Sequence, residues 1–344
     1  MDWLNIGTFE SGWIATLKKE GLKLEKRKRF FASLIALSLV LFLPSIIPAD
    51  AATKPKPKEI RKADLNKDGK TDMWDYYEYG KRVMFSQDKN LDGKPDIWKY
   101  LKNEKEIYKV EVDTNKDGKP DITYHLKNGK PERVEADTNK DGKIDLIQHV
   151  TGNNEVTSDE VDSNGNGKMD TFRYYANKKI TSIDYDTDEN GTIDKKETYG
   201  TDNKVEKLEI DKNKDGKFDI FFSYKDGNLV SKNADINFDG RIDIWEYYSN
   251  GKIAKRIISE KKNGVKNLYE FFRNGELVKK EIDKDFDGKI DTWQEFQNGK
   301  LTRILIDEDK DGNIDLWQYV ENDKIVKMEK DSNGDGTPDV TSYY

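Results

Sequence analysis

The chain has no cysteine and only two histidines among its 344 residues. Without cysteine there is neither a disulfide framework nor a lipidated cysteine at an export junction, so a lipoprotein is excluded. Zinc prefers cysteine and histidine ligands and finds almost no donors here. The sequence also lacks a G-x-S-x-G motif, a phosphate-binding glycine loop and a recognisable histidine triad. These absences predict that the protein is not an enzyme.

Hydrophobic residues are scarce at 34%, whereas charged residues make up 37% of the chain. Such a composition is typical of disordered proteins, because little apolar surface is available for burial. The aromatic residues argue against disorder here, because they recur at fixed places in a repeat. No long stretch after the N-terminal segment has apolar residues at a helical period, which favours an all-β fold.

One nine-residue motif occurs in eleven copies, at steps that are always multiples of 24 or 25 residues. The copy beginning at Asp283 has aspartate at positions 1, 3, 5 and 9 and Gly288 at position 6. Alternate residues of a curled loop can aim oxygen atoms at one hard cation, and glycine permits the sharp turn. A single copy would be read as an ordinary turn. Eleven copies in register predict calcium, because magnesium demands tighter octahedral geometry.

The predicted ligands are the side chains at positions 1, 3, 5 and 9 of each loop, together with an acid at position 12 in two loops. They are Asp64, Asn66, Asp68, Asp72, Asp88, Asn90, Asp92, Asp96, Asp113, Asn115, Asp117, Asp121, Asp137, Asn139, Asp141, Asp145, Asp162, Asn164, Asn166, Asp170, Asp186, Asp188, Asn190, Asp194, Glu197, Asp211, Asn213, Asp215, Asp219, Asp235, Asn237, Asp239, Asp243, Glu246, Asp283, Asp285, Asp287, Asp291, Asp307, Asp309, Asp311, Asp315, Asp331, Asn333, Asp335 and Asp339. Up to about eleven Ca²⁺ ions are expected, with dissociation constants of about 10⁻⁴–10⁻³ M. The loops at Asp186, Asp283 and Asp307 should fill first.

A twelfth slot falls in phase at Ser259 but has lost its acids, although Gly264 remains. In an EF-hand a glutamate at position 12 binds the ion through both oxygens. Among the intact loops only Asp75, Glu197 and Glu246 supply an acid there. Seven units, among them the unit of Glu197, have an acid two residues before the loop: Glu111, Glu135, Glu160, Asp184, Glu209, Glu281 and Glu329. These upstream acids either replace the twelfth ligand or are ordinary water-facing strand residues; the sequence leaves both open.

Between loops, each unit has about fifteen residues with a turn at the middle. Asn250-Gly251 and Asn298-Gly299 are examples of the two-residue sequences favoured by type I′ hairpins. We therefore predict tandem β-hairpin repeats of about 24 residues, joined by calcium loops along one edge of an elongated antiparallel array. Because pairs of units repeat at 48 or 49 residues, a closed six-bladed propeller is the alternative.

An aromatic residue follows the ninth loop position by two residues in many units: Trp74, Trp98, Phe172, Phe221, Trp245, Tyr269, Trp293 and Trp317. Residues two apart in a strand share a face, so these rings should form a row. The row serves either to pack each unit on its neighbour or to bind a peptide or glycan. Packing is the favoured interpretation, because a thin repeat array needs large side chains to bury surface.

The loops resemble the DxDxDG calcium-binding motifs of EF-hands, dockerins and thrombospondin type 3 repeats, as Asp307, Asp309, Asp311, Gly312 and Asp315 illustrate. The strand-turn-strand segments are weakly similar to MORN-like and YwqK-type bacterial repeats. The resemblance implies calcium binding in a bacterial exported protein. It extends from Asp64 to the C-terminus, and through the loops only.

The N-terminal part predicts export. A basic run at residues 23–29 precedes an apolar stretch at residues 30–47, and Ala49-Asp50-Ala51 has the spacing of a signal-peptidase site. Residues 1–51 are therefore predicted to be a leader, with an uncleaved membrane anchor as the alternative. Residues 52–63 are expected to be a basic, proline-containing tether, and residues 64–344 to be a twelve-unit repeat domain with a degenerate unit at 259–282.

Together these features predict a secreted or surface-associated protein in which calcium stabilises a structural or adhesive scaffold. It would be located in the periplasm, on the cell surface or outside the cell. The alternative is a peptide- or glycan-binding module with purely structural calcium. No nucleic-acid partner is expected, and contact with a membrane only through an uncleaved leader.

Overall fold

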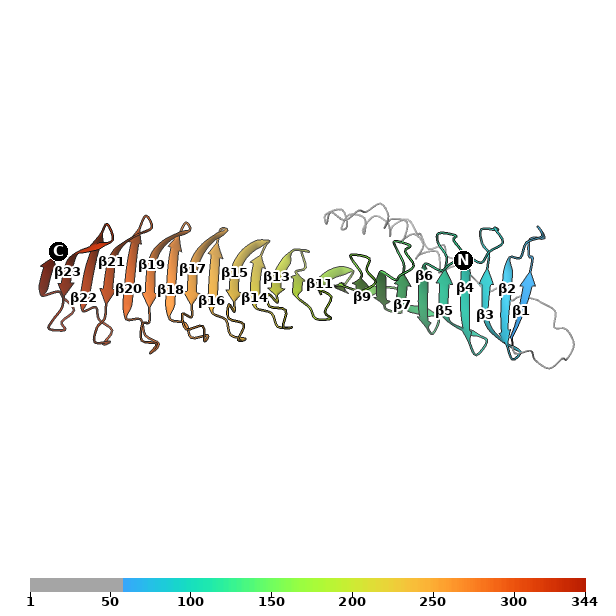
Figure 1. The fold of residues 1–344 in the computed structure, drawn as a ribbon, viewed down its shortest axis with the longest axis horizontal. Helices are drawn as coiled ribbons and strands as arrows, with labels where there is room; N and C mark the ends of the chain where they lie inside the picture. The colour runs from blue at the N-terminus through green and yellow to red at the C-terminus, as the bar shows by residue number, and fades with distance from the viewer. Residues whose placement is uncertain (1–57) are drawn as a thin grey trace. The chain divides into compact units, whose positions relative to one another are not determined.

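The computed structural model describes residues 58–344, which form 24 β-strands and no helix (Figure 1). The chain divides into two compact units, Met1–Met169 and Asp170–Tyr344. The described part of the first unit contains β1 (Lys58–Ala63), β2 (Met73–Glu78), β3 (Lys81–Gln87), β4 (Ile97–Lys102), β5 (Glu106–Val112), β6 (Ile122–Lys127), β7 (Lys130–Ala136), β8 (Leu146–Val150) and β9 (Val156–Val161).

The second unit contains β10 (Thr171–Ala176), β11 (Lys179–Tyr185), β12 (Lys195–Tyr199), β13 (Val205–Ile210), β14 (Ile220–Lys225), β15 (Asn228–Ala234), β16 (Ile244–Ser249), β17 (Lys252–Ile258), β18 (Leu268–Arg273), β19 (Glu276–Ile282), β20 (Thr292–Gln297), β21 (Lys300–Ile306), β22 (Leu316–Glu321), β23 (Lys324–Lys330) and β24 (Val340–Tyr343). The predicted leader lies outside the described residues. Among the residues that are described, no helix is long and apolar enough to cross a membrane.

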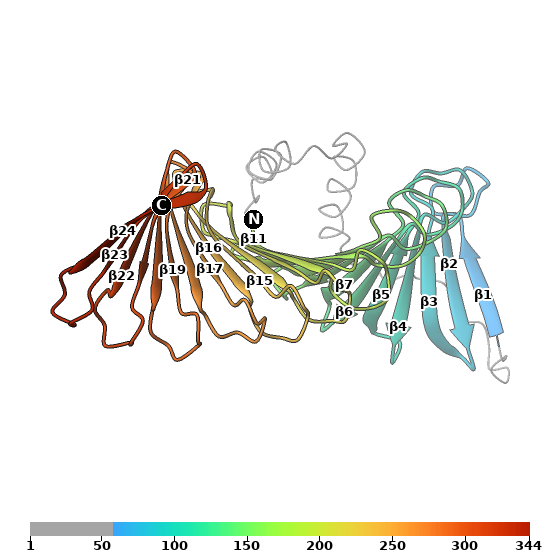
Figure 2. The same ribbon diagram turned by 60° about the vertical axis from the view of Figure 1, so that its left-hand side comes forward.

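Within each unit, every strand pairs antiparallel with the strands that precede and follow it in the chain. The prediction of an all-β array of tandem hairpins is therefore confirmed. A propeller would require separate four-stranded sheets, and neither unit has such breaks. Figure 2 shows neighbouring strands of the second unit rotating progressively, as expected from the twist of antiparallel sheets.

Both residues of each two-residue hairpin turn have the positive φ that the predicted type I′ turn requires. At Asn250 and Gly251 φ is 51° and 74°, and at Asn298 and Gly299 it is 50° and 74°. Beside each turn the register also shifts by one residue, so that Ala254 is left between the pairs Tyr247–Lys255 and Tyr248–Ile253. Such a bulge increases the local twist, and nothing in the sequence pattern marked it.

The length of the hairpin turn explains why some repeat steps have 24 residues and others have 25. In a 24-residue step the hairpin turn has two residues, as at 128–129, whereas the turn after β4 has three, at 103–105. The other 25-residue steps likewise contain the turns after β8 and β12. The additional residue is absorbed opposite the acidic loops, so it does not interrupt strand pairing and gives no basis for propeller blades.

The sheet begins earlier than the sequence analysis predicted. Lys58–Ala63, assigned to an extended tether, forms β1 and pairs with the whole of β2. The guanidinium carbon of Arg61 lies 4.4 Å from the ring centroid of Tyr77. The strand is held by backbone pairing and by the stems of long basic side chains, and its sequence therefore shows no alternating apolar pattern.

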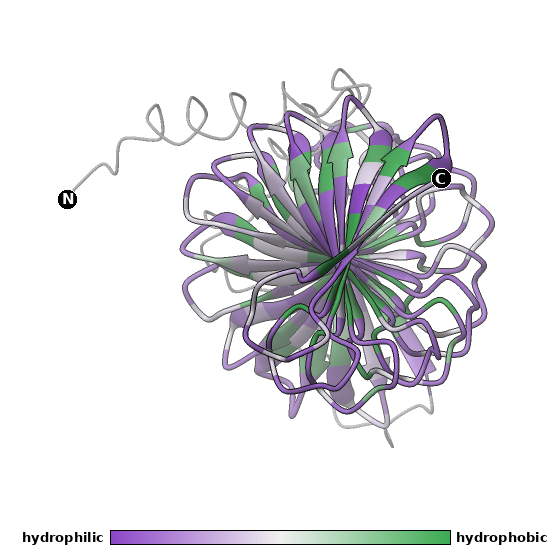
Figure 3. Cartoon of the chain, turned by 90° about the vertical axis from the view of Figure 1, so that its left-hand side faces the viewer, coloured by the Kyte–Doolittle hydropathy of each residue, from purple (hydrophilic) through white to green (hydrophobic). Residues whose placement is uncertain are grey.

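Six buried apolar residues of the first unit form a small cluster. It comprises Ile97, Val110, Ile122, Tyr124, Val134 and Ala136 on β4 to β7. Figure 3 shows hydrophobic colour confined mostly to the strands, while the connecting loops are hydrophilic. Most other strand residues are only half-buried, as expected for a single layer of sheet with water on both faces.

The aromatic residues lie in register on one face, but they do not stack on one another. Trp293 is paired with Glu281 and Leu305, and Trp317 is paired with Leu305 and Glu329. One strand therefore separates successive rings, which places them about 9–10 Å apart, beyond the range of ring stacking. Each ring is half-buried, except Trp74, which is buried.

Candidate metal-binding loops

The first aspartate of each loop organises the backbone around its carboxylate. In the loop of Asp283, Oδ1 accepts a hydrogen bond from the N–H of Phe286 at 2.7 Å and Oδ2 accepts one from Gly288 at 2.8 Å. The same pair of bonds occurs at Asp113, from Lys116 at 2.6 Å and Gly118 at 2.7 Å. Backbone donors stabilise the ionised carboxylate, so the loop is folded around a negative charge.

Asp162 illustrates the electrostatic balance at position 1. Partial burial opposes ionisation, but hydrogen bonds from the N–H groups of Gly167 and Gly165 outweigh it and lower the pKa of Asp162. The residues at positions 3 and 5 are more exposed, and each accepts a hydrogen bond from the backbone N–H two residues later. The side-chain oxygen of Asn115 accepts from the N–H of Asp117 at 2.8 Å, and Asp117 accepts from Lys119 at 2.8 Å. The bond from Lys119 is the main reason that the pKa of Asp117 is lowered.

The ninth aspartate closes the loop from the other side. Oδ2 of Asp72 accepts hydrogen bonds from the N–H groups of Leu65 at 2.7 Å and Asn66 at 3.1 Å. Its other oxygen, Oδ1, is buried and has no hydrogen-bond partner, and the same holds for Oδ1 of Asp194 and of Asp243. These three residues are only 7%, 3% and 0% exposed. A buried carboxylate oxygen without a donor is unfavourable, so these atoms have coordination capacity left over.

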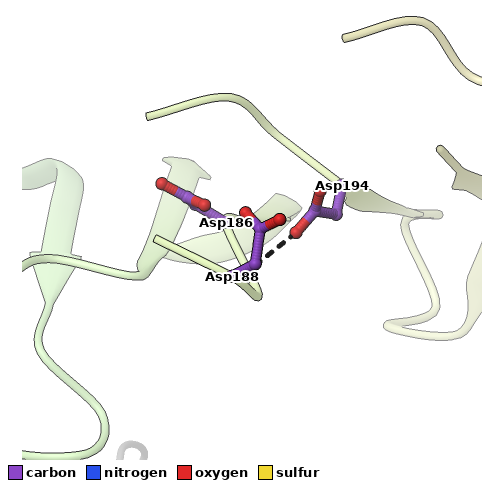
Figure 4. Close-up of side chains that lie close together, drawn as sticks. All are labelled: Asp186, Asp188 and Asp194. Atoms are coloured by element: carbon purple, nitrogen blue, oxygen red, sulfur yellow. Dashed lines mark hydrogen bonds between the residues drawn. The ribbon is translucent and has the colours of Figure 1, made fainter. Parts of the chain in front are cut away.

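Three groups of acids are brought within 4.8 Å of one another: Asp186, Asp188 and Asp194; Asp283, Asp285 and Asp291; and Asp307, Asp309 and Asp311. They belong to the loops that the sequence analysis expected to fill first. Figure 4 shows the first group, in which the N–H of Asp188 donates to Asp194. The donors are all oxygen, two of the three acids in this group are buried, and one buried oxygen is unpaired, a set that suits a hard divalent cation.

The fourth residue of each loop was missed by the sequence analysis. It has a positive φ throughout, for example 64° at Lys67, 66° at Lys310 and 69° at Phe286. Glycine marks this conformation in two loops, at Gly165 and Gly334, but the lysine, leucine and phenylalanine of other loops give no such signal. The strain is offset by the hydrogen bond that its N–H donates to the first aspartate, as Lys310 does to Asp307 at 2.7 Å.

The second residue also contributes where it has a hydroxyl group. Oγ1 of Thr114 and of Thr138 each donates to the ninth aspartate at 2.6 Å, and Oγ of Ser332 donates to Asp339 at 2.8 Å. The recurrence of threonine at this position was the available sequence signal.

The acids at position 12 lie on the sheet, away from the loop clusters. Oε1 of Glu246 is 3.0 Å from Nε of Arg256, and Oε1 of Glu197 is 2.6 Å from Nζ of Lys195. Neither glutamate belongs to a group of converging acids. A strand follows the loop, so position 12 is about 10 Å beyond position 9, whereas an EF-hand helix would turn it back toward the ion.

The acids upstream of the loops are likewise engaged on the sheet face. Glu111 is bonded to Nζ of Lys109 at 2.7 Å and to the hydroxyl of Tyr100 at 2.6 Å, and Glu281 lies 2.8 Å from Nζ of Lys279. The structure therefore favours the interpretation of these acids as strand residues paired with cations.

The degenerate loop keeps the same shape with neutral groups. Oγ of Ser259 replaces the first carboxylate and accepts from the N–H of Asn263 at 3.2 Å. Oδ1 of Asn267 replaces the ninth carboxylate and accepts from the N–H of Glu260 at 2.8 Å. Ser259 and Asn267 are 1% and 0% exposed. The hydrogen bonds of the loop are thus kept without carboxylates at its first and ninth positions.

Consecutive loops are joined by backbone hydrogen bonds. The N–H of Asp307 donates to the carbonyl of Asp291 at 2.9 Å, and the N–H of Asp331 donates to the carbonyl of Asp315 at 2.9 Å. The ninth residue of one loop is thus next to the first residue of the following loop. Within each unit the loops form a row along one edge, as predicted.

Comparison with known proteins supports the loop assignment and little more. The EF-hand family matches residues 135–146, which include the loop of Asp137. No curated protein matches the chain. A solved structure of accessory secretory protein 1, 2 and 3 from Streptococcus pneumoniae is 19% identical over 26% of this chain and 17% of that one, with a TM-score of 0.22.

A structure of TcdB2-TccC3 without its hypervariable C-terminal region is 12% identical over 77% of this chain and 16% of that chain, with a TM-score of 0.19. The chain spans about one sixth of the length of these two proteins. Neither similarity is close enough to carry an argument about fold or function. What stands is a tandem β-hairpin array whose loops have the EF-hand calcium pattern and clusters of acids suited to metal ions.

Proposed function

We propose that the protein is an exported scaffold whose β-hairpins are held in order by calcium ions in the acidic loops. Residues at positions 1, 3, 5 and 9 would hold each ion, which would neutralise their mutual repulsion. The observation that carries the proposal is the ninth aspartate of the loops at Asp64, Asp186 and Asp235, which keeps a buried oxygen without a hydrogen bond. That arrangement is costly unless a cation completes it.

The expected energies are large enough to decide the stability of the array. A ligand that binds only the folded state stabilises it in proportion to the logarithm of its concentration. For dissociation constants of about 10⁻⁴–10⁻³ M, calcium at about 1 mM stabilises each loop by about 0.4–1.4 kcal/mol. Summed over about eleven loops this is comparable with the whole stability of an ordinary domain, about 5–15 kcal/mol.

Export is the second part of the proposal, and it is supported by the sequence pattern of residues 23–51 and by the expected weak affinities. Sites of about 10⁻⁴–10⁻³ M are filled outside the cell, where calcium is abundant, and would be largely empty in the cytosol. A structural or adhesive role at the cell surface, in the periplasm or in the medium follows from this.

The alternative function, peptide or glycan binding by the aromatic row, has weaker support. Nζ of Lys266 lies 4.5 Å from the ring of Trp245, and Nζ of Lys255 lies 5.3 Å from the centroid of Tyr269. Lysine side chains therefore cover part of these rings. The half-buried rings fit the packing role better than a ligand platform.

Terbium luminescence excited through tryptophan tests the proposal on the full-length chain, because several tryptophans follow the ninth aspartate by two residues. Calcium should displace terbium at millimolar or lower concentration, and magnesium should do so much less well. Asp307→Asn should remove part of the signal, while Asp323→Asn, in a hairpin turn, should leave it unchanged. Equal displacement by both metals, or equal effects of both substitutions, would contradict calcium loops.

A further inference from the structure

Neighbouring loops are connected by a side-chain contact in addition to their backbone bonds. Nζ of Lys214, the fourth residue of its loop, lies 2.8 Å from Oδ2 of Asp188 and 3.8 Å from Oδ2 of Asp194 in the preceding loop. Lys310 makes the equivalent contact with Asp285. The left-handed conformation at position 4, with φ of 64° and 66°, accompanies a side chain that leaves its own loop and reaches the preceding one.

A third lysine repeats the arrangement in the first unit. Nζ of Lys140 lies 3.4 Å from Oδ2 of Asp121 and 3.3 Å from Oγ1 of Thr114, both in the preceding loop. Asp121 is the ninth residue of that loop, and its Oδ2 also accepts the N–H of Thr114 at 2.8 Å. In all three places an ammonium group lies against carboxylates that are predicted metal ligands.

The three converging acid groups differ in whether such a lysine reaches them. Lys214 contacts the group of Asp186, and Lys310 contacts the group of Asp283. The third group, around Asp307, is followed by a loop whose fourth residue is Gly334, which has no side chain to reach it. Lys330 does reach this loop, but it pairs at 2.8 Å with Glu308, which is not one of the three converging acids. The loops of Asp283 and Asp307 have the same four aspartates and form a natural matched pair.

The degenerate loop has a contact between the same two positions, made by different residues. Its third residue is Lys261, where other loops have an acid or asparagine, and the fourth residue of the next loop is Phe286. Nζ of Lys261 lies 3.3 Å from the centroid of the Phe286 ring. The contact between position 3 of one loop and position 4 of the next is thus kept where the acids are lost. Here the lysine is at position 3, whereas in the acidic loops it is at position 4.

We propose that Lys140, Lys214 and Lys310 are tethered counter-ions that compete with calcium for the preceding loop and so determine the order in which the loops fill. This inference rests on the proposed calcium binding. An ammonium ion on the adjacent loop is always present at high effective concentration, and calcium must displace it from the same carboxylate oxygens. The loop of Asp307 therefore fills before the loops of Asp186 and Asp283, although the sequence alone places the three together.

The effect should be modest, because these ion pairs are exposed. Pairs of this kind change an equilibrium by a factor of about two to five. A difference of that size between neighbouring loops spreads the binding over a wider range of calcium concentration. The array would then gain order gradually as calcium rises, without a single sharp transition.

The test is a calcium titration of the full-length chain labelled with ¹⁵N-glycine. The amides of Gly191, Gly288 and Gly312 each donate to the first aspartate of their loop, at 2.8, 2.8 and 2.9 Å, and so report on separate loops. In the unaltered chain Gly312 should respond at a lower calcium concentration than Gly288 and Gly191. Lys310→Met should lower the midpoint of Gly288 about two- to fivefold and leave that of Gly191 unchanged.

Lys289→Met is the matched control. It also removes one positive charge close to the carboxylates of the Asp283 loop, but it keeps the contact between Lys310 and Asp285. Lys214→Met, read at Gly191, is an independent second variant. The inference is overturned if Lys310→Met shifts Gly288 no more than Lys289→Met does, or if Gly312 does not respond first. If none of the three amides responds to millimolar calcium, the proposed function fails as well.

Discussion

The ninth aspartate is the residue on which each loop depends most directly. In the loop of Asp64 it accepts two backbone N–H groups with one oxygen, and in three loops its second oxygen is buried without a partner. The degenerate loop shows that asparagine can make the backbone bonds, because Oδ1 of Asn267 accepts the N–H of Glu260. The shape of the loop and its affinity for metal are therefore separable at this position.

Asp194→Asn should weaken calcium binding in its loop while leaving the calcium-free fold intact. Loss of a charged ligand should weaken the affinity by about tenfold or more, since the site loses part of its attraction for the ion. The Gly191 amide should then shift only at far higher calcium, whereas the melting temperature in chelator should stay within a few degrees. A large loss of calcium-free stability would show that the carboxylate has a structural role that asparagine does not replace.

The pair formed by Lys310 and Asp285 predicts a pH dependence in the absence of calcium. The hydrogen bond from Lys310 lowers the pKa of Asp285 below its ordinary value of 3.8. Because the folded-state pKa is the lower one, the contact stabilises the fold above pH ~4, and that contribution is lost as the pH falls through the folded pKa. Carboxyl ¹³C titration should place Asp285 below 3.8, and Lys310→Met should return it toward that value.

At the residue scale the sequence predicted the acids well and their neighbours poorly. The acids alternate with the spacing that cation coordination requires, and this spacing can be recognised directly in the amino-acid sequence. The left-handed conformation of the fourth residue accompanies a hydrogen bond from its backbone N–H to the first aspartate. Residue types such as Phe286 and Lys310 do not indicate this conformation. The lysine contacts depend on how two loops lie side by side, which no single repeat reveals.

At the scale of strands and turns, a ladder of alternating charged side chains takes the place of apolar packing. Across β15 to β19, Glu246 lies between Lys232 and Arg256, at 3.5 and 3.0 Å. Glu270 lies between Arg256 and Lys280, at 3.1 and 2.9 Å. Both glutamates are buried, and each has a cation on either side, so the ladder compensates the cost of burial.

Glu246→Gln separates the role in this ladder from the predicted role at position 12 of the loop of Asp235. If the ladder is its function, the substitution should lower stability in chelator by about 1–2 kcal/mol, because Arg256 loses one of its two partners. The calcium midpoint of the Gly240 amide should change by less than about twofold. A large weakening at Gly240 with unchanged stability would instead support Glu246 as a ligand.

The elements themselves were largely readable from sequence. Alternation and the asparagine-glycine pairs located the hairpins, because a type I′ turn needs positive φ at two residues. The bulge beside each turn was not predictable, since it is related to the twist of the paired strands and not to a particular residue type. β1 was missed because its residues look like a basic tether, and only pairing with β2 makes them a strand.

For the whole molecule, the central question is what replaces a thick hydrophobic core. In the described part of the first unit, the buried apolar cluster spans only β4 to β7, and most strand residues elsewhere are half-buried. Stability in such an array comes from contacts between nearest neighbours. Each acidic loop lies between two hairpins, so an ion bound there would act on the contact that the array most needs.

The most direct measurement of this account is thermal unfolding of the full-length chain, followed by circular dichroism, in chelator and in millimolar calcium. The account predicts a melting temperature that rises with the logarithm of calcium concentration, and a β-sheet signal that weakens at low temperature when chelator is added. Magnesium at the same concentration should give a much smaller shift. An identical melting temperature and spectrum with and without calcium would contradict the claim that metal ions hold the hairpins in order.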